Sequence, residues 1–230
     1  MKNVQLASKC PNCGASLPTG EKETICPYCG SPLVLSDERE ATGDACAQRG
    51  IEAHLSGEYS LAVEKLERAL ELGLTRYPIT RIYTILGNVY NESKNPEKAI
   101  AAFQKALQVD PHYYKAWVGL GIAYKKTGNL EERERCYREA LRIEPGYAHA
   151  HASLGALYIQ KNEPEKAIAA LEKALELNPT VAIAHANIAL AYAMVGRFDE
   201  ADAALRQATA LGYRNYKTVQ RRIAGLKELG

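Results

Sequence analysis

Leu120-Gly121-Ile122-Ala123-Tyr124 returns 34 residues later as Leu154-Gly155-Ala156-Leu157-Tyr158, and these two blocks decide the fold. A second block, with small residues and a closing proline, follows each copy in the same register. The weaker copies lie one step to either side: Leu86-Gly87 with Tyr90, and Ile188-Ala189 with Tyr192. Self-similarity at this period predicts stacked helical hairpins, because each repeat leaves apolar surface that only the next repeat covers.

The pattern resembles the tetratricopeptide repeat (TPR) family over about residues 43–215. The resemblance implies an all-α fold, a right-handed superhelix of helix–turn–helix repeats. We expect five repeats, at residues 43–76, 80–113, 114–147, 148–181 and 182–215. Residues 216–230 are predicted to be a C-terminal capping helix, because terminal repeats need a polar outer face; a membrane anchor is the alternative.

Small residues are expected where the two helices of a repeat cross. In the fourth repeat Gly155 is predicted to meet Ala167, since a larger side chain would hold the helices apart. In the third repeat Arg133 stands where the others have Ala. The crossing beside Gly121 is therefore expected to be altered.

Four cysteines form two C-P-x-C-G pairs near the start of the chain. Each pair places two thiolates on one tight turn, and two such turns supply the four soft ligands of tetrahedral zinc. The segment resembles a zinc ribbon with two knuckles, over about residues 8–35. A rubredoxin-like iron site and redox or disulfide use are the alternatives. We predict one structural Zn²⁺ held by Cys10, Cys13, Cys26 and Cys29.

The predicted domains are a small β zinc ribbon at residues 1–36 and a TPR solenoid at residues 37–230. So short a ribbon cannot bury a core alone, so metal binding should be part of its folding. Asp37 followed by Glu40 resembles a helix start, so the first helix is expected to begin near Asp37. The ribbon is expected to pack on the first repeat or to stand rigidly beside it.

The composition is that of an ordinary globular protein, with 47% hydrophobic and 24% charged residues. Lys and Arg number 29 against 27 Asp and Glu, a net charge of +2, which disfavours a chain built to coat nucleic acid. Residues 1–8 hold no secretory signal, and the longest apolar stretch is too short to span a membrane. We expect a cytoplasmic protein without membrane association.

The TPR resemblance implies a concave surface lined by the first helix of each repeat. Its middle is basic and polar and its C-terminal end is apolar, which predicts an acidic, partly apolar peptide or helix as the partner. The alternative is that the charges solvate a face and that the capping helix covers the apolar end. The predicted groove residues are Arg81, Asn88, Lys115, Ile122, Lys125, Lys126, His149, Ile183, Leu190 and Met194.

We therefore predict a non-enzymatic protein–protein interaction adaptor, with the zinc ribbon as a second docking or capping module. No phosphate loop, H-E-x-x-H motif or nucleophile elbow is present, so no enzymatic activity is expected. The alternative is a nucleic-acid- or ribosome-associated factor that uses the ribbon. A second metal site at His149, His151 and His185 is disfavoured, since His151 and His185 occupy the packing position of Trp117. Cys46 and Cys136 are expected to be buried thiols.

Overall fold

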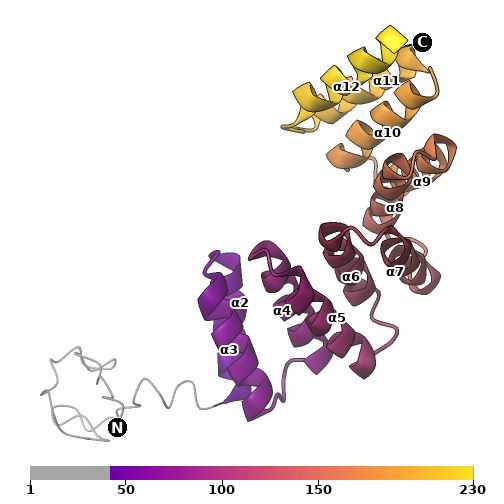
Figure 1. Ribbon diagram of the computed structural model, residues 1–230. Coiled ribbons are helices and arrows are strands. Elements are labelled where there is room, and N and C mark those ends of the chain that lie inside the picture. Colours follow the sequence, from indigo (N-terminus) through magenta and orange to yellow (C-terminus); the bar gives the residue numbers. More distant parts are fainter. Residues whose placement is uncertain (1–41, 230) are drawn as a thin grey trace, which may run out of the picture. The chain divides into compact units, whose positions relative to one another are not determined.

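The computed structural model describes residues 42–229, which form eleven α-helices and no strand (Figure 1). The predicted all-helical fold is confirmed for these residues. The predicted zinc ribbon and its ligands Cys10, Cys13, Cys26 and Cys29 lie outside the described residues. The chain divides into two units, one ending at Lys94 and the other starting at Asn95, and each is described by itself.

The first unit contains α2 (Gly43–Leu55), α3 (Tyr59–Leu72) and α4 (Ile79–Glu92). Helix α2 packs on α3, and α3 packs on α4. Thr42 is extended, and its hydroxyl accepts a hydrogen bond from the Ala45 amide at 3.2 Å, which is the geometry of a helix N-cap. Helix α2 therefore begins at Gly43, the predicted start of the first repeat, whereas the helix start expected near Asp37 lies outside the described residues.

The second unit contains α5 (Pro96–Val109), α6 (Tyr114–Thr127), α7 (Leu130–Ile143), α8 (Ala148–Gln160), α9 (Pro164–Leu177), α10 (Ala182–Met194), α11 (Phe198–Ala210) and α12 (Tyr216–Leu229). Helices α6, α8 and α10 start 34 residues apart, and each packs against the helix that follows it (Figure 1). Turns between the helices of a pair carry a positive φ at Gly128, Asn162 and Gly196. Glycine and asparagine tolerate this conformation, which explains these turn residues.

The crossing of paired helices differs from the sequence expectation. A Cβ atom added to Gly121 would lie 2.4 Å from Cε1 of Tyr137. A Cβ on Gly155 would lie 2.4 Å from Cγ of Leu171. The nearest neighbours of the glycines are therefore these large residues, each one helical turn beyond the expected Arg133 and Ala167.

Helix α12 packs against α10 and α11. Its Val219 and Ile223 are buried in the core of the second unit, at 8% and 2% exposure. The helix thus covers the last helical pair, as the capping prediction requires. Within residues 42–229, no helix combines the length and the apolar character needed to cross a membrane.

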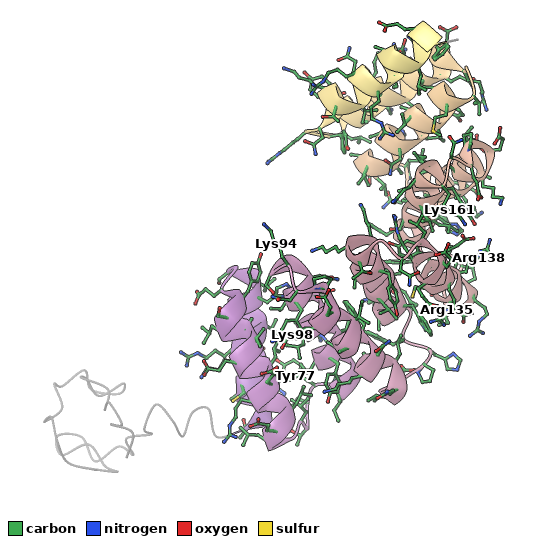
Figure 2. The ribbon with its side chains drawn as sticks, in the orientation of Figure 1. Tyr77, Lys94, Lys98, Arg135, Arg138 and Lys161 are labelled. Atoms are coloured by element: carbon green, nitrogen blue, oxygen red, sulfur yellow. The ribbon has the colours of Figure 1, made fainter. Side chains whose placement is uncertain are left out.

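An ion cluster joins α7 to the end of α8. The carboxylate of Glu134 lies 2.7 Å from Nη2 of Arg138 and 2.6 Å from Nζ of Lys161, both of which are labelled in Figure 2. The hydroxyl of Tyr158 donates to the same carboxylate at 3.3 Å. Burial raises the pKa of Glu134, but Lys161 and Arg138 lower it more, so the pKa lies below its ordinary value.

Candidate functional site on helices α6, α8 and α10

Charge is segregated between the two helices of each pair in the second unit. The first helices, α6, α8 and α10, carry three lysines and no Asp or Glu. The second helices, α7, α9 and α11, carry acidic residues and hold basic residues in local ion pairs, such as Arg135–Glu132 at 2.7 Å and Lys173–Glu176 at 2.9 Å. All three lysines are on α6, and α8 and α10 carry no Lys, Arg, Asp or Glu, so the positive charge of the first helices is concentrated on α6.

We call one face of these three helices the A-face. Its members occupy equivalent positions of the repeat and are exposed or half-buried. They are Lys115, Ile122, Lys125 and Lys126 of α6, His149 and Gln160 of α8, and Ile183 and Met194 of α10.

Aromatic rings meet at the start of α6 and just before the start of α8. The ring centroids of Tyr114 and Tyr147 are 5.0 Å apart in an edge-to-face arrangement, and those of Tyr147 and His149 are 5.5 Å apart. The ammonium of Lys115 lies 5.8 Å from the centroid of Tyr114. Burial raises the pKa of Tyr147, and the neighbouring Tyr114 raises it further. Lys115 and His149 thus lie at one connected aromatic patch.

At the end of α8, a buried arginine of α7 contacts the helix. Arg133 of α7 is 2% exposed, and its Nη1 donates to Oε1 of Gln160 at 2.8 Å. Its guanidinium also lies 5.6 Å from the ring centroid of Tyr137. Burial lowers the pKa of Lys125, and the positive charge of Arg133 lowers it further. Arg133 and Gln160 therefore meet beside the end of α8.

The apolar part of the A-face is smaller than the sequence predicts. Ile122 and Ile183 are exposed, at 40% and 52%, and Met194 is half-buried. Leu190 is only 4% exposed and belongs to the hydrophobic core of the second unit. Four helices pack against α10, and the Leu190 side chain is buried among them, so it cannot contact a partner.

The two remaining predicted groove residues, Arg81 and Asn88, lie on α4 in the first unit. Arg81 is exposed, with its guanidinium 5.9 Å from the ring centroid of Tyr77, and Asn88 is half-buried. They belong to a unit that is described separately, so they are not counted in the A-face.

The histidines at the packing position, His151 and His185, form hydrogen bonds to backbone carbonyls. Nε1 of Trp117 donates to the Pro111 carbonyl at 2.9 Å, and Nε2 of His151 and of His185 lies 2.9 Å from the corresponding carbonyl of Pro145 and of Pro179. A carbonyl only accepts, so Nε2 carries the proton in both histidines. Among residues 42–229, no group of three or more His, Cys, Asp or Glu side chains has a metal-binding arrangement.

Sequence reasoning noticed Arg133 only as a disturbance of helix crossing. Its contact with Gln160, 27 residues away, was not predicted. The available signal was the replacement of Ala by Arg at a position where the neighbouring repeats have Ala167 and Ala201, both fully buried. A charged residue at a buried position requires an unusual local environment.

Several solved structures resemble the chain in fold. The MamA protein aligns with a TM-score of 0.61 at 23% identity, over 78% of this chain and 95% of MamA. TTC0263, a thermophilic TPR protein of Thermus thermophilus, aligns with a TM-score of 0.62 at 23% identity, over 80% of this chain and 98% of its own. YrrB, titled a TPR protein with an unusual peptide-binding site, aligns with a TM-score of 0.60 at 18% identity, over 84% of this chain and 95% of its own.

Comparison with sequence families also identifies tetratricopeptide repeats. A search of curated proteins found no match. A tetratricopeptide repeat family matches residues 48–113. The family described as the middle TPR-like domain of cilia and flagella-associated protein 70 matches residues 83–211, which is more than half of the chain. The protein therefore belongs to this family of tetratricopeptide-repeat-like domains.

Proposed function

We propose that the protein is a non-enzymatic interaction scaffold that binds a peptide or helix of a partner protein on the A-face. The observation that carries the proposal is the charge segregation of the second unit: α6, α8 and α10 hold three lysines and no acidic residue. Exposed Ile122 and Ile183 lie on the same face. A partner segment with acidic and apolar residues complements this surface.

The peptide-binding site named for YrrB supports a peptide as the kind of ligand, since that protein shares the fold. Burying Ile122 and Ile183 would supply apolar contact, while Lys115 and Lys126 would attract acidic side chains. Charge complementarity of this kind acts mainly on specificity and on the rate of association.

We further propose that Cys10, Cys13, Cys26 and Cys29 hold a structural Zn²⁺ in a ribbon that serves as a second docking or capping module. The support is the donor set itself: two C-P-x-C-G pairs separated by 12 residues. Four thiolates close the coordination shell of zinc, which suits a structural role.

Two synthetic peptides of equal length test the A-face, one rich in Glu and Leu and one with Lys in place of every Glu. The acidic peptide should bind the wild-type chain, and added salt should weaken its binding. The variant Lys115→Glu/Lys126→Glu should weaken this binding by about tenfold or more, because two favourable charge contacts become repulsive.

The matched control is Lys166→Glu/Lys173→Glu on α9, which makes the same change in net charge on a second helix. Both control lysines are exposed and sit in surface ion pairs, which contribute little to stability. The proposal fails if the control weakens peptide binding as much as the A-face variant, or if the basic peptide binds equally well. Tighter binding of a single-stranded RNA than of the acidic peptide would favour a nucleic-acid partner instead.

A further inference from the structure

Residues 203–229 concentrate positive charge. They hold six Lys and Arg side chains against the one carboxylate of Glu228, a net charge of +5, whereas the whole chain carries +2. All six basic side chains are exposed. They are Arg206 of α11, Arg214 of the connecting turn, and Lys217, Arg221, Arg222 and Lys227 of α12. The nearly balanced charge of the whole chain therefore includes a local basic surface.

Most of these charges have no local counter-charge. Basic residues of α7 differ, since they form ion pairs within the helix, such as Arg142–Glu139 at 2.9 Å. Within residues 95–229, no carboxylate lies within salt-bridge distance of Arg206, Lys217 or Arg221. Lys217 and Arg221 are also four residues apart on α12, a spacing at which like charges repel and destabilise a helix. An external anion would relieve this repulsion.

A cleft lies between α11 and α12, which pack against each other (Figure 1). Its volume of about 490 Å³ falls in the range of ligand pockets, roughly 300–1,000 Å³. The wall residues that matter for binding are Asp202, Arg206 and Thr209 of α11, and Tyr216 and Gln220 of α12. The cleft is therefore large enough to receive one nucleobase.

The polar groups of the cleft differ in what they can still bind. Asp202 is neutralised by Nζ of Lys227 at 2.9 Å, and the hydroxyl of Thr209 donates to the Leu205 carbonyl at 2.9 Å. Arg206 therefore contributes an unpaired positive charge. Exposed Gln220 offers an amide that both donates and accepts hydrogen bonds, and half-buried Tyr216 offers an aromatic ring. A base with its neighbouring phosphate matches this set of groups.

Helix geometry decides which charges adjoin the cleft. An α-helix turns by about 100° per residue, so Lys217 and Arg221 each lie about 100° around α12 from Tyr216 and Gln220, respectively. Arg222 lies about 200° from Gln220, on the other side of the helix. Lys217 and Arg221 therefore continue the cleft surface, and Arg222 does not.

We propose that the cleft between α11 and α12 binds one base of a single-stranded nucleic acid against Tyr216. Arg206, Lys217 and Arg221 pair with the adjoining phosphates, and the Gln220 amide meets the polar edge of the base. An aromatic ring beside a basic surface binds single strands with little sequence preference, because every base has a π-face. None of these residues belongs to the A-face, so this activity goes beyond the scaffold function.

Two other anionic partners fit the same surface less well. A basic amphipathic helix can lie on an anionic membrane, but it must insert its apolar face. In α12 that face contains Val219 and Ile223, which are 8% and 2% exposed and belong to the core of the second unit. An acidic peptide would pair with the charges and leave the aromatic cleft unfilled. A single strand uses both the charges and the cleft.

Fluorescence anisotropy with the full chain tests the proposal. The probe is a labelled RNA strand of about ten alternating cytidines and adenosines, and its binding should saturate and should weaken as salt is added. The same strand in a duplex with its complement should bind about tenfold more weakly, because its bases are paired and stacked. Equal or tighter binding of the duplex, or of phosphatidylserine vesicles at equal phosphate concentration, would overturn the proposal. A DNA strand of the same sequence distinguishes the two sources, and failure of both strands also overturns it.

Arg221→Gln and Arg222→Gln form a matched pair, since both residues are exposed neighbours on α12 and each change removes one charge. Arg221→Gln should weaken RNA binding by about fivefold and lower the slope of log affinity against log salt by about 0.7, the loss of one phosphate contact. Arg222→Gln should leave the affinity nearly unchanged at about 0.15 M salt, where charges are screened beyond about 8 Å. Equal effects of the two changes would contradict the site.

Tyr216 is tested by a conservative and a disruptive change. Tyr216→Phe should bind RNA as the wild type does, and Tyr216→Leu should weaken binding by about tenfold, because the base loses its stacking partner. Equal binding by the two variants would show that no base stacks there. If Tyr216→Leu fails to fold, the comparison of Arg221→Gln with Arg222→Gln still decides the outcome.

The two proposed sites are separated by exchanging their variants. Lys115→Glu/Lys126→Glu should leave RNA binding unchanged, and Arg221→Gln should leave binding of the acidic peptide unchanged. RNA and the acidic peptide are therefore compared at the A-face in the Arg221→Gln/Tyr216→Leu chain. If the A-face variant abolishes RNA binding and Arg221→Gln does not weaken it, the cleft between α11 and α12 is not the nucleic-acid site.

Discussion

Gly155 of α8 lies so close to Leu171 of α9 that a Cβ atom on the glycine would be 2.4 Å from Cγ of the leucine. Real Cβ atoms do not approach other heavy atoms this closely, so any side chain at this position must push α8 and α9 apart or force Leu171 from its rotamer. Leu171 is fully buried and has no free space into which it can move.

Gly155→Ala should therefore destabilise the protein by about 1–3 kcal/mol, the usual cost of overpacking a core. Gly225→Ala on α12 is the matched control, since an added Cβ there meets nothing within 4 Å. That change should stabilise by about 0.5–1 kcal/mol, because Ala favours a helix more than Gly does. Urea unfolding measures both, and equal effects of the two substitutions would contradict the close contact.

Cys136 should resist alkylation in the folded protein. Burial raises its pKa to about 12, and its side chain is fully buried. At mildly alkaline pH only about one molecule in ten thousand would carry the reactive thiolate. Iodoacetamide labelling followed by peptide mass spectrometry reads each cysteine separately. Cys136 should be labelled in urea but not in buffer, and rapid labelling in buffer would show that the α7 core opens.

Stability should fall in acid partly through Glu134. Its pKa is lowered in the folded state, so the carboxylate contributes stability that is present above the unfolded value, about 4.5, and is lost as the pH falls through the folded value. Glu134→Gln should lower the melting temperature at neutral pH and should reduce its fall on acidification. Melting curves over a pH series measure this. The prediction is wrong if wild type and variant lose stability in parallel from neutral to acid pH.

The purified chain should contain about one zinc ion, bound by Cys10, Cys13, Cys26 and Cys29. Elemental analysis counts the metal, and iron in its place would support the rubredoxin-like alternative. Replacement of Cys13 by Ser should release the zinc, whereas Cys136→Ala should retain it. Chelation should leave most of the helical circular dichroism signal, because residues 43–229 bury their own core.

Much of the fold was predictable because residues at the same position of successive repeats lie in similar surroundings. Trp117, His151 and His185 occupy one register position, and each ring nitrogen meets a proline carbonyl at 2.9 Å. The same logic located the exposed Lys115 and Ile183 on equivalent positions of α6 and α10. These outcomes depend on local helix geometry and on the adjacent turn, both of which the sequence encodes directly.

The periodicity of the sequence specified the helical repeat, the lack of acidic residues on α6, α8 and α10, and the small residues at the crossings. Side-chain contacts depend on how the helices pack: Gly155 packs against Leu171, Leu190 is buried, and Arg133 contacts Gln160. Periodicity specifies the face on which a residue lies, but burial depends on every helix packed around it and on side-chain length. Arg133 stands where neighbouring repeats have alanine, and its buried guanidinium needs a hydrogen-bond acceptor. That acceptor is Oε1 of Gln160, 27 residues away on the next repeat.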